Sequence, residues 1–312
     1  MSTHTHAHNA RLRQLSGSDP TGTAAIRRNF VRAARRRFRR LRGRTRSVAG
    51  YEEDRLHLRQ GARLAEGDPE NIERFPTDGG KRAAFITWLK AYLAEEVLQR
   101  VPAEGVAKGA HWTSDFIRAA YRTGYETARG RLGNEGVAVG GPEENPLQLG
   151  VAQSTLRQLY QRTYGNLTSV TDDAVAAVRD ELTRGLAEGV NPREMARRLS
   201  KEIRTIQRTQ AEVLARTEVI NAHTQATLSR YDEANVGQVT VSGEFTTAQD
   251  DRVCPVCESI AGEIFELDAL RGDSETFTFE PAADEPDHLA GEYRIAPPVH
   301  PRCRCAVLPV IA

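Results

Sequence analysis

All four cysteines of this 312-residue chain lie beyond residue 253, in two short motifs. The first motif is Cys254-Pro-Val-Cys257, and the second is His300-Pro-Arg-Cys303-Arg-Cys305. Thiolate and imidazole are the donors that a tetrahedral zinc ion takes, and pairs at such short spacing are typical of structural zinc sites. Two disulfides, or reduced thiols in a small core, are the alternatives. The motifs predict one structural zinc ion, with Cys254, Cys257, His300, Cys303 and Cys305 as candidate ligands.

These five candidates exceed the four positions of a tetrahedral site. Residues two apart on an extended segment face opposite sides of it. We therefore expect Cys303 and Cys305 not to ligate one ion together unless a turn separates them. One of His300, Cys303 and Cys305 should then be a packing residue beside the site.

The rest of the composition excludes some classes of protein. No apolar run approaches the ~20 residues of a membrane span, and the N-terminal segment around His4, His6 and His8 lacks the apolar core of a signal peptide. We expect a protein outside the membrane that is made in a reducing cytosol, where metal binding is favoured over disulfides. The formal net charge of +1 conceals a strong separation of basic and acidic segments.

Residues 1–50 are predicted to form a basic arm. Eleven arginines fall between Ile26 and Arg46, and no acidic residue lies between Asp19 and Glu52. Like charges repel at helical spacing, so we expect this arm to be helical only when an anion neutralises it, and to lie outside the core. Nucleic acid, bound through its phosphates without base reading, is the expected partner; an acidic protein surface or no specific role are the alternatives. The candidate nucleic-acid-binding residues are Arg27, Arg28, Arg32, Arg35, Arg36, Arg37, Arg39 and Arg40.

Two helical regions are predicted next, over 51–140 and 147–236, with a Gly/Pro-rich linker at 140–146. In both regions apolar residues recur every three or four positions, as on the buried face of a helix. Asn191-Pro192 predicts a helix start, because Asn is a common N-cap and Pro is favoured at the first helical position. A separate helix is expected from about 206 to 234.

Two polar residues of that last helix, Arg216 and Glu218, are predicted to be structural. Residues two apart on a helix do not face each other, so each should pair with another element. An acid–base pair of Glu218 with His223 is the less favoured alternative.

The C-terminal region, 237–312, is predicted to be a small α+β zinc-binding region. Alternating apolar residues from Val239 to Thr247 indicate a strand, and a second short strand should follow Cys305. An acidic insertion at 263–292 separates the two cysteine motifs. The expected fold class is α+β: helical N-terminal and middle regions, with a small C-terminal zinc-knuckle domain that contains β-strands.

The C-terminal region resembles the phage head morphogenesis proteins typified by protein F of phage Mu, also called minor head or minor capsid proteins. The resemblance covers about 206–310, with weaker helical similarity from about 150. Two features depart from the family pattern: Phe245 stands where the family often has Trp, and the acidic insertion is long. The matching residues are Arg216 to Glu218, Asp250 or Asp251 with Arg252, Cys254, Cys257, Gly262, and Pro297 to Cys305.

This resemblance implies a minor head protein of a tailed virus, a structural component and not an enzyme. Such a protein would associate with the portal protein and other capsid proteins and assist head assembly and genome packaging or delivery. It would reside in the virion, at the capsid interior or portal vertex, and in the host cytoplasm during assembly. The basic arm would contact the packaged double-stranded DNA.

Two other functions remain as alternatives. One is a zinc-containing, nuclease-like DNA-processing enzyme that uses Asp284, Glu285, His288 and His300. A site saturated by four Cys/His ligands disfavours it, because no position is left for a metal-activated water. The other is a host regulator with a zinc ribbon, which the acidic insertion beside the cysteines disfavours.

Overall fold

The computed structural model divides the chain into two compact units. Unit 1 comprises residues 1–29, 107–161 and 213–312, and unit 2 comprises residues 30–106 and 162–212. The expected linker at 140–146 lies outside the described residues, as does most of the N-terminal part of the basic arm. The described residues are 19–51, 78–137, 147, 150–235, 239–271 and 275–312.

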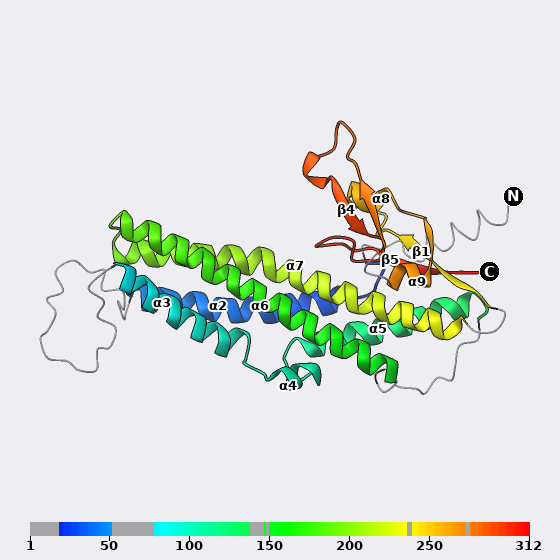
Figure 1. Cartoon of the computed structure of the whole chain (residues 1–312), viewed down its shortest axis with the longest axis horizontal. Helices are drawn as coiled ribbons and strands as arrows, with labels where there is room; N and C mark the ends of the chain where they lie inside the picture. The colour runs from blue at the N-terminus through cyan, green and yellow to red at the C-terminus, as the bar shows by residue number, and fades with distance from the viewer. Residues whose placement is uncertain (1–18, 52–77, 138–146, 148–149, 236–238, 272–274) are drawn as a thin grey trace, which may run out of the picture. The chain divides into compact units, whose positions relative to one another are not determined.

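The described part of unit 2 is helical (Figure 1). The helices α2, α6 and α7 contribute residues to both units. In unit 2, Arg82 of α3 donates a 3.0 Å hydrogen bond to Thr183 of α6. The elements with residues in this unit are α2 (Ala24–Arg46), η1 (Ser47–Tyr51), α3 (Asp78–Tyr92), η2 (Leu93–Val97), α4 (Ala103–Ala107), α6 (Gly150–Ala187) and α7 (Pro192–Ala234).

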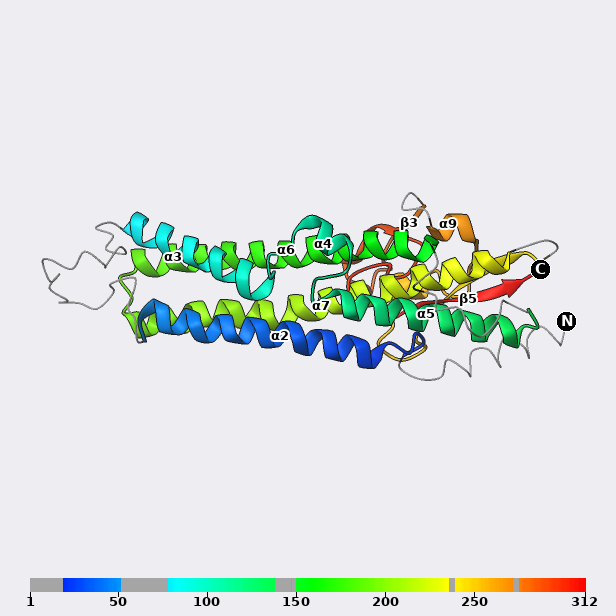
Figure 2. The same cartoon turned by 90° about the horizontal axis from the view of Figure 1, so that it is seen from below.

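The arginine-rich segment is the helix α2, and its apolar side belongs to the core. Phe30, Phe38 and Leu41 are completely buried. In unit 2, α2 runs beside α7 (Figure 2), and Gln207 of α7 donates a 2.9 Å hydrogen bond to the carbonyl of Arg35. The expectation of an arm outside the core, helical only when an anion neutralises it, is therefore wrong.

The helix α7 extends without a break from Pro192 to Ala234, whereas the sequence predicted two helices. Its start is as predicted: the backbone N–H of Glu194 donates to Oδ1 of Asn191 over 3.0 Å. Ile203 and Ile206, on either side of the expected break, are both buried, so the apolar stripe simply continues. A Gly or Pro that would end the helix is absent between them.

Unit 1 contains a small antiparallel sheet and short helices. The strand order is β2-β1-β5, with β1 in the centre. Within unit 1, β5 lies against α5 (Ser114–Asn134), and Tyr231 of α7 donates a 3.2 Å hydrogen bond to the carbonyl of Val307 in β5. The strands are β1 (Val241–Thr246), β2 (Ile264–Glu266) and β5 (Ala306–Ile311), and the short helices are α8 (Pro255–Glu258) and α9 (Leu267–Arg271).

The acidic insertion is folded. Its second half forms the antiparallel pair β3 (Thr276–Phe279) and β4 (Gly291–Arg294), with the 3-10 turn η4 (Asp287–Leu289) between them. Two apolar clusters hold the region. The first joins Leu267 and Leu270 of α9 to Leu228 and Tyr231 of α7, and the second joins Phe279 of β3 to the cysteines. The mostly helical chain with a small C-terminal sheet confirms the α+β fold class.

Candidate metal centre

The two cysteine motifs, 43 to 51 residues apart in the chain, meet in unit 1. The Nε2 atom of His300 lies 2.9 Å from the Sγ of Cys254 and 3.2 Å from the Sγ of Cys257. The Sγ atoms of Cys257 and Cys303 are 3.9 Å apart. Two groups of donors result, and in each the donor atoms lie within 4.8 Å of one another: Cys254, Cys257 and His300, and Cys257, Cys303 and Cys305. All four cysteines are free thiols.

Local backbone geometry directs the donors inward. Cys254 is the N-cap of α8, with Pro255 at the first helical position, and its Sγ accepts a hydrogen bond from the backbone N–H of Cys257. In the second motif the backbone of Arg302 turns at a φ of +70°, and the N–H of Cys305 points to the Sγ of Cys303 over 3.5 Å. Backbone N–H groups that donate to sulfur favour the thiolate, which is the form that binds metal.

Cys303 and Cys305 do not face opposite sides of the chain; the expectation that they would not share an ion applied to an extended segment, and residues 303–305 are not in a strand. Their Sγ atoms lie within 4.8 Å of each other, and both side chains are buried. The alternation rule applies to extended strands. Here β5 begins only at Ala306, and the turn at Arg302 leaves residues 303–305 outside any strand.

Electrostatics in the cluster favour deprotonated sulfur at Cys254 and Cys303, whereas the hydrogen bonds of Cys257 with Cys254 and of Cys305 with Cys303 raise the pKa of Cys257 and Cys305. A hydrogen bond with Cys257, followed by one with His300, lowers the pKa of the Cys254 thiol to about 4. Burial opposes protonation of His300, but its hydrogen bond to Cys254 raises the pKa of the imidazole to about 9. The pKa of Cys303 is also lowered, first by the hydrogen bond with Cys257. A cation in this cluster would meet preformed negative charge.

An ion pair joins the segments that carry the two motifs. Arg304 grips Asp250 with two hydrogen bonds, of 2.6 Å and 2.5 Å, and its side chain is only 12% exposed. Arg252, 64% exposed, contacts the same carboxylate over 2.7 Å. Hydrogen bonds from Arg304 and then Arg252 hold the pKa of Asp250 well below its usual value. Arg216 of α7 donates to the carbonyl of Arg302 over 3.3 Å, which ties the second motif to the helix.

The space between the donors fits an ion and not a substrate. A cavity of about 30 Å³ is lined by the five donors with Arg252, Arg302 and Arg304 among others. A cavity of that size has room for a single ion or a water molecule and not for an organic substrate. Its five Cys/His donors are enough to fill the four positions of a structural zinc site, whereas catalytic sites keep one position open.

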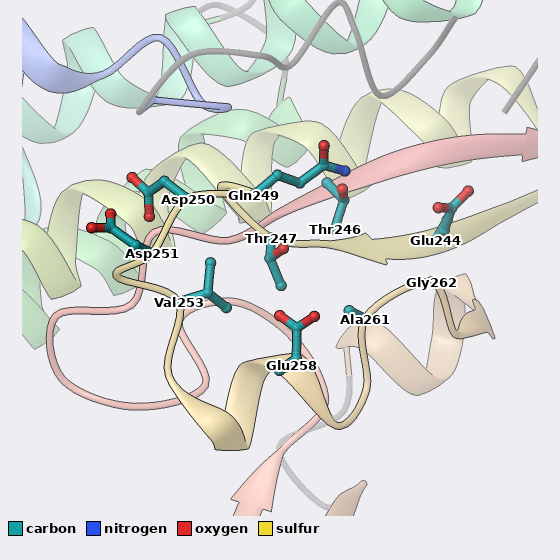
Figure 3. A pocket seen from close by; sticks show the side chains of 10 residues that line it. All are labelled: Glu244, Thr246, Thr247, Gln249, Asp250, Asp251, Val253, Glu258, Ala261 and Gly262. Atoms are coloured by element: carbon teal, nitrogen blue, oxygen red, sulfur yellow. The ribbon is translucent and has the colours of Figure 1, made fainter. Parts of the chain in front are cut away.

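A larger cavity of about 450 Å³ lies beside the centre, between β1 and α8. Figure 3 shows Glu258 rising from α8 toward Thr247, with Asp250 and Asp251 on the turn that follows β1. The lining includes Val253, which the small cavity shares, but none of the five Cys/His donors. The larger cavity therefore gives a substrate no direct contact with a donor.

The residues of the nuclease alternative do not join this cluster. Asp284 and His288 are exposed, and Glu285 is half-buried near the tip of the insertion. Among the described residues, three or more Cys, His, Asp or Glu donors lie within 4.8 Å of one another only in the two Cys/His groups. Of the four nuclease candidates, these groups contain His300 alone.

The eight candidate arginines of the basic segment divide into two sets. Arg27, Arg35 and Arg40 form ion pairs with Asp19, Glu212 and Glu96, respectively. Arg37 donates to the carbonyl of Ala33 over 3.3 Å, and burial with the nearby charges of Arg40 and Arg36 lowers its pKa to about 10. The other four are exposed and form no ion pair with a described residue: Arg28, Arg32, Arg36 and Arg39.

The structural polar candidates on α7 occupy different environments. Glu218 is 1% exposed, while Arg216 reaches the metal centre as described above. His223 is also 1% exposed, and burial, followed by the charges of Arg131 and Arg27, lowers its pKa to about 3. A base sealed from solvent in this way cannot exchange protons with a bound substrate, so the acid–base alternative loses its support.

Sequence reasoning missed the pairing of Asp250 with Arg304. The two residues are 54 positions apart, and each stands among other charged residues. A single clue was present: both lie within four residues of a cysteine.

The described structure defines a mostly helical α+β protein whose small C-terminal β region carries a Cys/His cluster able to hold a metal ion. Residues 176–308, which include all five donors, match the model of the family described as "Phage Mu protein F like protein", so this region of the chain is similar to that family. The match supports a phage head morphogenesis protein. Neither a curated protein nor a solved structure matches the chain. Among the described residues, no helix has the length and apolar character of a membrane span.

Proposed function

We propose that this protein is a minor head protein of a tailed virus, a structural component that associates with the portal and other capsid proteins. The observation that carries the proposal is the Mu F-like match over 176–308. The closed Cys/His cluster adds support, because it offers a fold-stabilising ion and no open position for catalysis. The protein acts at the capsid interior or portal vertex, and resides in the host cytoplasm until assembly.

Two measurements test this role. Density for the protein in a reconstruction of the virion should lie at the portal vertex or inside the shell. Procapsids assembled without the protein should be fewer or fail to package DNA. Absence of the protein from both procapsids and virions would reject the proposal.

The cluster holds one structural zinc ion through Cys254, Cys257, His300 and Cys303. Zinc–sulfur bonds of about 2.3 Å and zinc–nitrogen bonds of about 2.0 Å put tetrahedral donors roughly 3.5–3.8 Å apart. The 3.9 Å between Cys257 and Cys303 fits that spacing, and the His300 distances of 2.9 Å and 3.2 Å need only a small outward shift. Cys305, whose Sγ lies within 4.8 Å of those of Cys257 and Cys303, is then the packing residue beside the site.

Elemental analysis of the purified chain should give about one zinc ion per molecule. Cys303→Ser should lose the metal, whereas Cys305→Ser should keep it, although the two changes are chemically identical. If Cys305→Ser alone loses zinc, the fourth ligand is Cys305. Two disulfides and no metal under native conditions would rule the site out.

The exposed arginines of α2 contact the packaged double-stranded DNA. Phosphate contacts of this kind release counterions, so the logarithm of affinity falls linearly with the logarithm of salt concentration. Arg32→Gln/Arg36→Gln/Arg39→Gln should flatten that dependence by about 2.7, or about 0.9 for each phosphate contact. An unchanged slope would exclude this contact.

The nuclease-like enzyme is the second candidate, and the separation of His288 from the Cys/His cluster argues against it. Purified protein should leave single- and double-stranded DNA intact in the presence of magnesium, manganese or zinc. Metal-dependent cleavage that His288→Ala abolishes would favour the enzyme.

A further inference from the structure

The outer face of α2 forms a continuous basic stripe in unit 2. Arg32, Arg36 and Arg39 are exposed and form no ion pair with a described residue. At 3.6 residues per turn and 1.5 Å per residue, successive members lie on one side of the helix and about 4.5–6 Å apart along it. Arg42 is half-buried at the edge of this stripe. The helix thus presents a line of positive charge whose guanidinium groups are available to an anion.

The neighbouring helix α7 extends this line of charge. Gln207 donates to the carbonyl of Arg35, and Arg35 donates to the carbonyl of Arg208 over 3.3 Å, so the two helices run in contact within unit 2 (Figure 2). Arg204 and Arg208 are exposed, one helical turn apart. Neither forms an ion pair with a described residue.

Like charges from the two helices are close enough to disturb one another. Burial lowers the pKa of Arg42, and the nearest charges that add to the effect are Arg204 of α7 and then Arg39 of α2. The acidic residues of this stretch of α7 do not neutralise them. Glu212 is paired with Arg35, and Glu202 lies about 160° around the helix from Arg204.

The composition of the surface favours phosphates over a protein partner. Protein interfaces centre on apolar or aromatic anchors. The large hydrophobic side chains that stand exposed among the described residues are Val151 and Ile264, and neither is on α2 or on α7. Every long exposed side chain of the stripe is an arginine, whose guanidinium group can donate two hydrogen bonds to one phosphate.

We infer that α2 and α7 form one composite surface for the phosphates of duplex DNA, in which Arg204 and Arg208 act together with Arg32, Arg36, Arg39 and Arg42. This inference rests on the proposed contact between α2 and DNA and adds the α7 arginines, which α2 alone does not require. Six phosphate contacts give a slope of about −5 for the logarithm of affinity against the logarithm of salt concentration.

The test measures binding of the full chain to a fluorescent 20-base-pair duplex across a range of salt concentrations. Arg204→Gln/Arg208→Gln should reduce the magnitude of the slope by about 1.8, because two phosphate contacts are lost. The matched control is Arg122→Gln/Arg157→Gln, which removes the same charge from exposed positions of unit 1. The control should keep the slope of the unaltered protein. Circular dichroism verifies that each variant is folded.

The outcomes separate the inference from the proposal beneath it. If the α2 triple variant flattens the slope while the α7 double variant matches the control, the composite surface is refuted and the α2 contact stands. If neither flattens it, both are refuted. If the chain does not bind DNA but binds polyglutamate, and this binding requires the same six arginines, the partner is an acidic protein and the inference is overturned.

Discussion

Gly124 of α5 is a position where two helices of unit 1 approach closely. A Cβ atom at Gly124 would lie 2.3 Å from the carbonyl oxygen of His223 and 2.9 Å from its Cα, both in the backbone of α7. Thr227 strengthens the contact by donating to the carbonyls of Gly124 and His223, over 3.4 Å and 3.0 Å. Backbone atoms inside a helix cannot rotate aside, so Gly124→Ala must push the helices apart.

The expected magnitude follows from two opposing terms. Alanine in a helix interior is favoured over glycine by about 0.5–1 kcal/mol. Overpacking typically costs about 1–3 kcal/mol, and a backbone clash belongs at the upper end of that range. Gly124→Ala should therefore lower the free energy of unfolding by about 2 kcal/mol.

Gly130 of the same helix is the matched control. A Cβ atom there meets nothing within 4 Å, so Gly130→Ala should raise the free energy of unfolding by about 0.5–1 kcal/mol. The two variants should thus differ by about 3 kcal/mol in urea unfolding. Trp112, whose ring lies 6.3 Å from that of Phe116 in α5, reports on unit 1 by fluorescence in a Trp88→Phe background. Equal stability of the two alanine variants would refute the close approach.

Three further outcomes are expected. The folded pKa of His223, about 3, lies below the unfolded value of 6.5, so the unfolded state binds a proton first as the pH falls. The free energy of unfolding should therefore decrease between pH 6.5 and pH 3, by up to about 4 kcal/mol. His223→Gln should lack this decrease, and a variant with the same pH dependence as the unaltered protein would contradict the assignment. Arg304→Gln should weaken zinc affinity 10- to 100-fold in a competition titration, because residues that orient metal ligands have effects of this size. Arg252→Gln, which removes the exposed partner of the same Asp250, should change the zinc affinity little. Chelation should raise amide hydrogen exchange in residues 239–312 while the helices of unit 2 keep their protection; uniform protection after metal removal would show that the ion is not structural.

Two effects oppose each other in α2: repulsion among its arginines, which disfavours a packed helix, and burial of Phe30, Phe38 and Leu41, which favours it. Each like-charge pair costs a few tenths of a kcal/mol, whereas burying one such apolar side chain contributes about 1.5–3 kcal/mol. Three buried side chains outweigh several repelling pairs, particularly when Arg35 and Arg40 find carboxylates on other elements.

The C-terminal motifs were more informative than the helices. Ligand chemistry is encoded in residue type and short spacing, so the sequence predicted that the five Cys/His candidates meet. It did not predict how Cys303 and Cys305 are placed, because that depends on the positive φ of Arg302, a residue type that rarely adopts that conformation. Long-range partners such as Asp250 and Arg304 also leave no periodic signal.

Arg131 joins three distant stretches of the chain, since it donates to the carbonyl of Pro20 over 2.7 Å and to that of Val307 over 3.0 Å. During translation Pro20 emerges first, and Val307 follows roughly 15–60 s later at 5–20 residues per second. All segments of unit 2 are made by residue 212, so unit 2 can fold on the ribosome while unit 1 still waits for its last strand. Nascent chains stalled before β5 should expose the Arg131 side of α5 to chaperones and proteases. The order of synthesis therefore makes unit 1 the part that proteases can cleave before folding is complete.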